Sequence, residues 1–227
     1  MGVVVAMDGP SGSGKSSTSR GVATRLGLRY LDTGAMYRAM TWWMLEHDVD
    51  VHDPEAVAVH AYEPVLVSGT DPLAPTITVD GIDVSGLIRG AEVTLAVSAV
   101  SAVPEVRERL RREQLDIIGD GGIVVEGRDI GTVVVPDAPL KLYLTADPEA
   151  RAARRTAELT GADVTATRAD LLRRDKLDSG RATAPLAMAA DAHHLDTTPY
   201  TLDEVVEQVV ALVTLSARDH GPDATGS

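Results

Sequence analysis

The sequence contains no cysteine among its 227 residues. This absence excludes disulfide bonds, thiolate metal sites and a cysteine nucleophile, and it is typical of a protein from a reducing compartment. The sequence also lacks any uninterrupted run of the about eighteen apolar residues that span a bilayer. Its apolar start is short and leads directly into a glycine-rich loop, which argues against a signal peptide. We therefore expect a soluble, cytoplasmic protein with no membrane partner.

Lysine is scarce, and the chain as a whole is acidic. Lys15, Lys141 and Lys176 are the only lysines among 21 basic residues, and the others are arginines. The formal net charge of −13 argues against a nucleic-acid polymer as partner. An anionic ligand would need a local group of arginines, whose guanidinium groups bind phosphate through two parallel hydrogen bonds.

A phosphate-binding motif lies near the start of the chain. Residues 9–16 have the sequence GPSGSGKS, which fits G-x-x-x-x-G-K-[ST]. A buried strand is predicted before it at 3–7 and a helix after it at 16–26, a context that a flexible linker would not have. The glycines let backbone N–H groups point inward at phosphate oxygens, beside the positive end of the helix. We expect Lys15 to reach the β- and γ-phosphates and Ser16 to ligate Mg²⁺.

The rest of the chain alternates predicted strands and helices. A helix is expected from 33 to 44, capped by Asp32 or Thr33. It carries Arg38 at the sheet edge where open α/β sheets bind ligands. The helix also carries the Trp42-Trp43 pair, which we expect to pack in the core. The other predicted elements are strands at 28–31, 122–125, 140–144 and 194–196, and a closing helix at 202–215.

A compositionally distinct insert is predicted between about residues 49 and 90. Asp80-Gly81 separates two alternating segments, 76–79 and 82–84, which indicates an antiparallel hairpin. Further along, Pro104 is predicted to open a helix. That helix bears four arginines, of which we expect three to be solvated surface: Arg107, Arg109, Arg111 and Arg112.

Two charged segments are harder to explain by packing. Arg128-Asp129 lies between glycines directly after a buried strand, which favours a functional role. The segment 168–181 is dense in charge, and it is either an exposed helix with weak ion pairs or a lid that closes arginines over phosphates. The pair His193-His194 lacks the spacing of a metal site on one helical face, so we interpret it as structural.

Several motifs together resemble the bacterial cytidylate kinase family of nucleoside monophosphate kinases. The resemblance extends from Val3 to about Leu212. The phosphate-binding motif alone is shared with a very large superfamily, whereas the combination is much more specific. The segments are GPSGSGKSS at 9–17, LDTGAMYR at 31–38, IRGAEVTLAVSAVSAVPEVR at 88–107, VEGRDIGTVV at 125–134, RRDKLDSGRATAPL at 173–186 and HHLDTT at 193–198.

The resemblance implies an α/β P-loop NTPase fold. This fold has a five-stranded parallel sheet with helices on both faces, a small antiparallel monophosphate-binding insert and a lid. It implies one kinase unit, 1–216, with a disordered tail at 217–227. Within the unit the expected parts are a core at 1–48, 119–160 and 186–216, an insert at about 49–118 and a lid at about 161–185. The implied reaction transfers the γ-phosphoryl group of ATP to CMP or dCMP with Mg²⁺, in a monomer.

The resemblance also assigns roles to residues. Asp129 is expected to accept a hydrogen bond from the cytosine amino group, or else to orient Arg107 or Arg128 by an ion pair. Asp178 and Arg181 would face the ribose together if both lie on a helix. Thr33 keeps the hydroxyl of the serine that some relatives have. The expected ATP-binding residues are Gly9, Pro10, Ser11, Gly12, Ser13, Gly14, Lys15, Ser16, Ser17 and Arg154. The expected acceptor-binding residues are Thr33, Arg38, Arg89, Ser98, Arg107, Arg128, Asp129, Asp178 and Arg181, and the expected catalytic residues are Lys15, Arg38, Arg128 and Arg174.

Two alternatives remain open at the level of sequence. One is a different small-molecule P-loop kinase, with shikimate or another nucleotide as acceptor. The other is a non-enzymatic nucleotide switch or GTPase, against which the absence of an Asn-Lys-x-Asp guanine signature counts.

Overall fold

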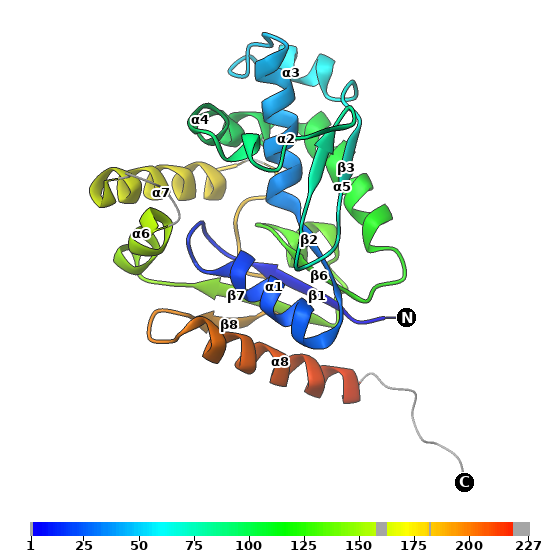
Figure 1. The fold of residues 1–227 in the computed structure, drawn as a ribbon, viewed down its shortest axis with the longest axis vertical. Helices are drawn as coiled ribbons and strands as arrows, with labels where there is room; N and C mark the ends of the chain where they lie inside the picture. The colour runs from blue at the N-terminus through cyan, green and yellow to red at the C-terminus, as the bar shows by residue number, and fades with distance from the viewer. Residues whose placement is uncertain (1, 158–162, 182, 220–227) are drawn as a thin grey trace.

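A parallel five-stranded sheet forms the centre of the computed structural model of the chain, which describes residues 2–157, 163–181 and 183–219 (Figure 1). The strand order is β2-β6-β1-β7-β8, and every neighbouring pair is parallel. The strands are β1 (Val4–Asp8), β2 (Arg29–Asp32), β6 (Ile123–Glu126), β7 (Leu140–Thr145) and β8 (His193–Asp196). The carboxyl ends of β1, β2 and β6 therefore meet at one edge of the sheet, where ligands bind in open α/β sheets.

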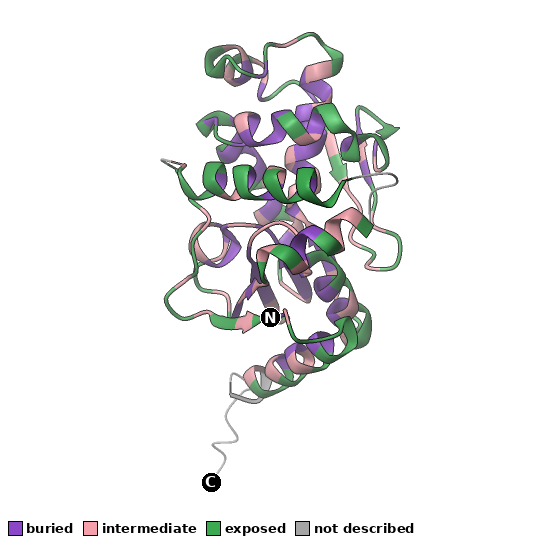
Figure 2. Ribbon diagram, turned by 90° about the vertical axis from the view of Figure 1, so that its left-hand side faces the viewer, coloured by how far each residue is buried: buried purple, intermediate pink, exposed green. Residues whose placement is uncertain are grey.

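Helices cover both faces of this sheet, as the sequence predicts. Because side chains alternate along a strand, Ala6 packs into the core beneath α2 (Thr33–Glu46), while Val5 and Met7 pack toward α1 (Lys15–Leu26) and α8 (Leu202–Asp219). Figure 2 shows the buried residues gathered between the layers, with the outer faces of the helices exposed.

Helices α1 and α8 pack closely against each other. The apolar positions of α8 recur every three or four residues, at Val205, Val206, Val209 and Val213. Gly21 of α1 permits the close approach, because a Cβ atom there would lie 2.7 Å from a methyl carbon of Val206.

The expected antiparallel insert is present as a three-stranded sheet, β3-β4-β5. Its hairpin turns at Asp80 and Gly81, whose φ angles of 51° and 81° suit a two-residue turn matched to strand twist. Figure 1 shows the insert gathered at one end of the molecule. The elements here are α3 (Pro54–His60), β3 (Leu66–Ser68), β4 (Ile77–Val79), β5 (Ile82–Asp83), a 3-10 turn η1 (Leu87–Arg89), α4 (Ala91–Val100) and α5 (Pro104–Ile118).

The expectation that three arginines of α5 are solvated surface is wrong. Arg107 and Arg109 are both buried, with 7% and 8% of their surface exposed. Arg109 donates to the carbonyl oxygens of Ala61, at 2.7 Å, and Pro64, and it pairs with Glu113. Buried carbonyl groups of a turn need donors, and a long arginine reaching from a neighbouring helix supplies them.

The boundaries near the end of the chain differ slightly from expectation. Helix α8 continues to Asp219 and so includes the first three residues of the expected tail, while residues 220–227 lie outside the described residues. The expected lid at 161–185 contains α7 (Val164–Ser179), while 161–162 and 182 are also outside the described residues. Helix α6 (Pro148–Ala157) precedes it. Within the described ranges, no helix is both long and apolar enough to cross a membrane.

Candidate active site

The glycine loop between β1 and α1 has the conformation that its sequence predicts. Gly9, Gly12 and Gly14 have φ angles of 144°, 78° and 86°, a region that favours glycine. At Gly9 a Cβ atom would lie 2.1 Å from the carbonyl oxygen of Leu144, so no side chain fits there. The loop therefore curls at the N-terminus of α1, where the helix dipole favours an anion.

Lys15 is buried within this loop, with 5% of its surface exposed. Its Nζ donates to the carbonyl oxygen of Pro10 at 3.0 Å. Burial and then the charge of Arg128 lower the pKa of Lys15, while Glu126 and Asp8 act in the opposite direction. Bound phosphate would favour the charged ammonium group.

Glu126 is a site residue to which the sequence analysis gave no role. It ends β6, next to β1, and its Oε2 accepts a hydrogen bond from Ser16 Oγ at 2.9 Å. Its other oxygen accepts from the buried hydroxyl of Tyr30. Burial and the nearby Asp32 raise the pKa of Glu126, and Lys15 opposes that shift. The sequence did contain a signal for this role, because Glu126 is an acidic residue at the end of a predicted buried strand. In P-loop enzymes, an acidic residue at the end of such a strand helps to hold Mg²⁺.

A second group of residues surrounds the far end of the cleft. Arg107 donates to the carboxylate of Asp129 and to the carbonyl oxygen of Ser101 at 3.1 Å, and its guanidinium carbon lies 5.4 Å from the centre of the Tyr37 ring. The sequence left open whether Asp129 forms an ion pair and whether its partner is Arg107 or Arg128. In the structure the ion pair is present, and the partner is Arg107. Burial raises the pKa of Tyr37 to about 12.

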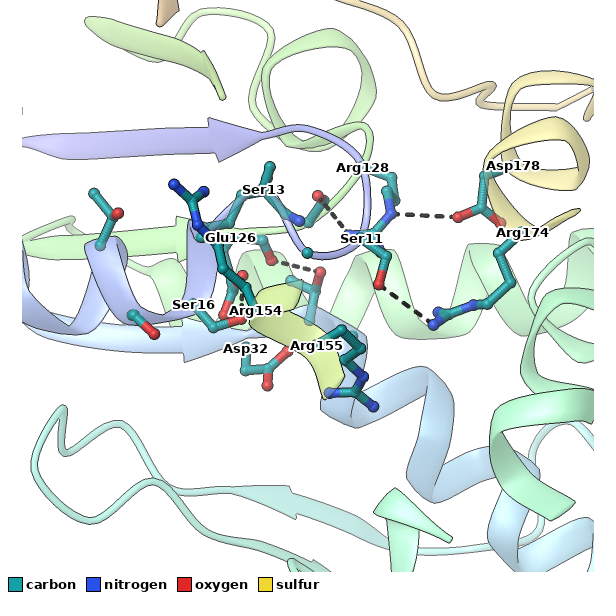
Figure 3. A pocket seen from close by; sticks show the side chains of 18 of the residues that line it. Ser11, Ser13, Ser16, Asp32, Glu126, Arg128, Arg154, Arg155, Arg174 and Asp178 are labelled. Atoms are coloured by element: carbon teal, nitrogen blue, oxygen red, sulfur yellow. Dashed lines mark hydrogen bonds and ion pairs between the residues drawn. The ribbon is translucent and has the colours of Figure 1, made fainter. Parts of the chain in front are cut away.

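Asp178 connects three elements near this end of the cleft. Its carboxylate accepts from Ser98 Oγ at 3.4 Å, Arg128 Nε at 3.3 Å and Arg181 at 2.6 Å. Figure 3 shows Asp178 and Arg128 facing each other from opposite sides. Helix α7 ends at Ser179, so Asp178 and Arg181 do not lie together on this helix. The two side chains nevertheless meet, because Gly180, at φ −87° and ψ 2°, keeps the backbone close to helical and its N–H donates to the carbonyl oxygen of Lys176.

Three arginines converge between these groups: Arg38 of α2, Arg128 after β6 and Arg174 of α7. Arg38 donates to the carbonyl oxygen of Ile88 and to Thr94 Oγ1, at 3.0 and 2.9 Å. Arg174 reaches from α7 to Ser11 Oγ at 3.4 Å (Figure 3). Burial and then the charge of Arg174 lower the pKa of Arg38, although an arginine stays charged at neutral pH. Positive charge is thus concentrated here in a molecule of strongly negative net charge.

Most of these residues line one cleft of about 910 Å³. Every predicted site residue lines it, including Thr33, Arg89 and Arg154, except Gly9 and Pro10, the first two residues of the loop. Arg154 donates to Thr197 Oγ1 at 2.8 Å and also to its carbonyl oxygen. Sequence reasoning also missed Tyr37, Glu126, Arg155, Thr197 and Tyr200, which share the lining.

The fold and the site together define a P-loop kinase: a parallel sheet with the phosphate-binding loop at its edge, and arginines facing that loop across a cleft. Residues 5–215 match the family model described as cytidylate kinase, and the chain belongs to this family.

Relatives of known name agree with this assignment. The chain is 64% identical over 213 residues to a cytidylate kinase of Streptomyces griseus, covering 93% of this chain and 92% of the relative. It is 57% identical over 216 residues to a cytidylate kinase of Nocardia farcinica, covering 93% of each. Among solved structures, an uncharacterized protein from Eubacterium ventriosum aligns with a TM-score of 0.50 and 10% identity over 93% of this chain and 98% of its own. That likeness concerns the fold alone.

Proposed function

We propose that this chain transfers the γ-phosphoryl group of ATP to CMP or dCMP, giving ADP and CDP or dCDP. The observation that carries the proposal is one cleft with a phosphate-binding loop at one end and the buried Arg107–Asp129 pair at the other. Both ends belong to a chain whose relatives are named cytidylate kinase.

We assign the binding of ATP to the glycine loop and to Arg174 and Arg154, which line the cleft near it. Backbone N–H groups of residues 11–17 and the ammonium group of Lys15 bind the phosphates. Ser13 Oγ and Arg174 Nε are buried and have no hydrogen-bond partner among the described residues, so both are available to a ligand. Arg154 closes this end from α6.

The acceptor half is assigned to residues of the insert, β6 and α7. Arg38 and Arg128 bind the phosphate of CMP, with Arg89 and Thr33 beside them. Ser98, Arg107 and Asp129 surround the base, where a carboxylate accepts a hydrogen bond from the amino group of cytosine. Asp178 and Arg181 contact the ribose.

The chemistry needs positioning and charge stabilisation and no covalent intermediate. An oxygen of the CMP phosphate attacks the γ-phosphorus of ATP, and the bond to the leaving oxygen of ADP breaks. Two unit charges 4 Å apart repel by about 4 kcal/mol at an effective dielectric of about 20, and each phosphate carries more than one charge. Lys15 and the arginines Arg38, Arg128 and Arg174 offset this repulsion and hold the reacting groups in line.

The oxygen donors of Ser16 and Glu126 fit Mg²⁺. The Ser16 hydroxyl retains lone pairs while it donates to Glu126, and hydroxyl and carboxylate oxygens are ligands that this ion prefers. Among the described residues no cluster of three acidic, histidine or cysteine side chains could hold a metal alone. This agrees with an ion that arrives with the nucleotide, since Mg²⁺ is commonly bound through one or two carboxylates plus phosphates. When bound, the ion supplies neutralisation of charge on the transferred phosphoryl group.

Substrate profiling tests the function and separates it from the alternatives. ADP formation is followed in a coupled assay with CMP, dCMP, UMP, GMP, AMP and shikimate as single acceptors. We expect CMP and dCMP to be used at least about 100-fold better than the purine nucleotides, which are too large for the base pocket. UMP is expected to be weak, because it presents a carbonyl group where cytosine presents an amino group. Equal rates with CMP and AMP, preference for shikimate, or hydrolysis unaffected by any acceptor would contradict the proposal.

We also propose that small molecules are the chain's partners and that it acts as a monomer in the cytoplasm. Support comes from its acidic net charge, which argues against a nucleic-acid polymer as partner, and from the arginine-lined cleft, which suits small phosphorylated molecules. A molar mass by light scattering close to 23.9 kDa is the expected result, and a stable dimer mass would contradict it.

A further inference from the structure

Asp8 is a buried carboxylate to which no role has so far been assigned. It is the last residue of β1 and directly precedes Gly9 of the phosphate-binding loop. The rest of β1 is apolar, and Asp8 has 4% of its surface exposed. A carboxylate is costly to bury unless hydrogen bonds compensate it. Its two oxygens accept from the backbone N–H groups of Ile130, at 2.9 Å, and Gly131, at 2.8 Å.

These two N–H groups open the short π-helical turn η2 (Ile130–Val134). The turn begins directly after Asp129, whose carbonyl oxygen accepts from Val133 N and Val134 N at 2.8 and 3.2 Å. The first N–H groups of a helical turn have no partner inside it, and the side chain of the N-cap residue commonly binds the second or third of them. Aspartate is among the best residues for that position.

Asp129 occupies the N-cap position of η2 but makes no capping hydrogen bond with its side chain. Its carboxylate instead pairs with Arg107 in the base pocket. Asp8, more than a hundred residues away in the chain, binds the N–H groups of Ile130 and Gly131 instead, and the N–H of Gly131 is one that an N-cap side chain commonly binds.

We infer that Asp8 is a positioning residue for the acceptor pocket: it caps the η2 turn in place of Asp129 and so leaves the Asp129 carboxylate available to Arg107 and the base. The inference rests on the proposed function in so far as the base is cytosine. Asp8 also ties the acceptor pocket to the strand that leads into the ATP-binding loop, because it belongs to β1.

The isosteric variant Asp8→Asn provides a direct test. An asparagine offers one acceptor oxygen where two are needed, and its NH₂ group would face an N–H group. The turn would then compete for the carboxylate of Asp129. We expect kcat/KM for CMP to fall about 10- to 100-fold, with the discrimination between CMP and UMP reduced. The Kd for ATP measured by calorimetry should change less than about twofold. Asp116→Asn on the exposed face of α5 removes the same charge elsewhere and should change none of these values.

A double-mutant cycle separates this role from a general effect on stability. If Asp8 acts through Asp129, then Asp8→Asn in an Asp129→Ala background should cost less than about threefold further, because no carboxylate remains to be displaced. Fully additive effects, unchanged kinetics for CMP, or equal losses of ATP and CMP binding in Asp8→Asn would each overturn the inference. A wild-type chain that does not phosphorylate CMP would instead overturn the proposed function.

A measurement on the unaltered protein applies even if the variant does not fold. Burial raises the pKa of Asp8 to about 6, with Asp129 acting in the same direction, while the two backbone N–H groups and Lys15 oppose the shift. Tyr143 also faces Asp8 from β7, and the ammonium group of Lys141, which lies against Gly131, is paired with Asp191. Acidification should therefore move the amide proton resonances of Ile130 and Gly131 upfield together, with a midpoint near pH 6. Resonances that stay constant from pH 4 to 8 would show that the carboxylate is not their partner.

Discussion

The roles of several site residues in this protein depend on contacts with residues that are distant in sequence. Lys15 and Ser16 were predicted from a local motif, since the glycine loop fixes their positions by itself. Glu126 and Asp8 were given no role, because what identifies them is a partner more than a hundred residues away. Arg109 was predicted as surface for a similar reason, since its carbonyl partners, Ala61 and Pro64, lie 48 and 45 residues earlier in the chain.

The pair Ser16–Glu126 leads to a prediction about the metal. In Glu126→Gln the side chain keeps its shape but loses the negative charge that orients the Ser16 hydroxyl. Partners that orient a metal ligand typically change affinity by 10- to 100-fold. We therefore expect Mn²⁺ to bind the enzyme–ADP complex about 10- to 100-fold more weakly, measured by electron paramagnetic resonance, while ADP binding without metal is retained.

Glu46→Gln serves as the matched control for this experiment. Glu46 is exposed at the end of α2, so its variant loses the same charge without touching the cleft. Unchanged Mn²⁺ affinity in Glu126→Gln would remove Glu126 from the metal site.

The secondary-structure elements were largely predictable, because their periodicity is local. The Asp80-Gly81 hairpin, the start of α5 at Pro104 and the helix capped by Asp32 all follow from short patterns, and Asp32 Oδ1 accepts from Ala35 N at 2.9 Å. The strand order was not predictable in this way, since parallel pairing joins segments that no turn connects. The end of α7 at Ser179, before Arg181, was likewise not predicted.

Helix α7 is the element whose behaviour we propose to change with ligands. Of its leucines, Leu171 is buried, while Leu172 and Leu177 are exposed. Its other contacts with the cleft are made by charged groups, including the bond of Arg174 to Ser11. An element with few apolar anchors opens at low cost, and phosphates can order it through charge-assisted hydrogen bonds. We expect hydrogen exchange of residues 168–181 to slow when CMP and a non-hydrolysable ATP analogue bind together.

Arg181→Ala tests the segment directly after α7, which we propose to meet the acceptor. Removing a charge-assisted hydrogen bond of this kind typically costs about 1.5–3 kcal/mol. We therefore predict a rise of about 10- to 100-fold in KM for CMP, with ATP binding changed less than about twofold. Arg173→Ala, on the exposed side of α7 and paired with Asp170, should leave both values unchanged. The proposal would be contradicted if residues 168–181 were equally protected with and without ligands and Arg181→Ala had normal CMP kinetics. The charged residues of this segment would then be only a solvated helix face.

At the scale of the whole molecule, an acidic protein encloses a basic cleft. The net charge is −13, yet buried Arg38 of α2 and Arg174 of α7 lie in the cleft that faces the glycine loop, and Arg107 of α5 lies at its far end. The sequence predicted the need for such a group, but only the fold shows that its members meet. The sheet edge brings the loop, Glu126 and Arg128 to one end of the strands, and the insert and α7 close the cleft from the other side.

The central claim is that this cleft binds ATP and CMP at once, with their phosphates facing each other. A bisubstrate analogue in which adenosine and cytidine are linked by five phosphates tests it most directly. Linking two ligands with suitable geometry raises affinity by about 10²- to 10⁴-fold over either alone. We predict that calorimetry will give a Kd at least about 100-fold below those of ATP and CMP, and a much weaker Kd for the analogue with two adenosines. A linked analogue that binds no more tightly than ATP, or two analogues that bind equally, would contradict the account.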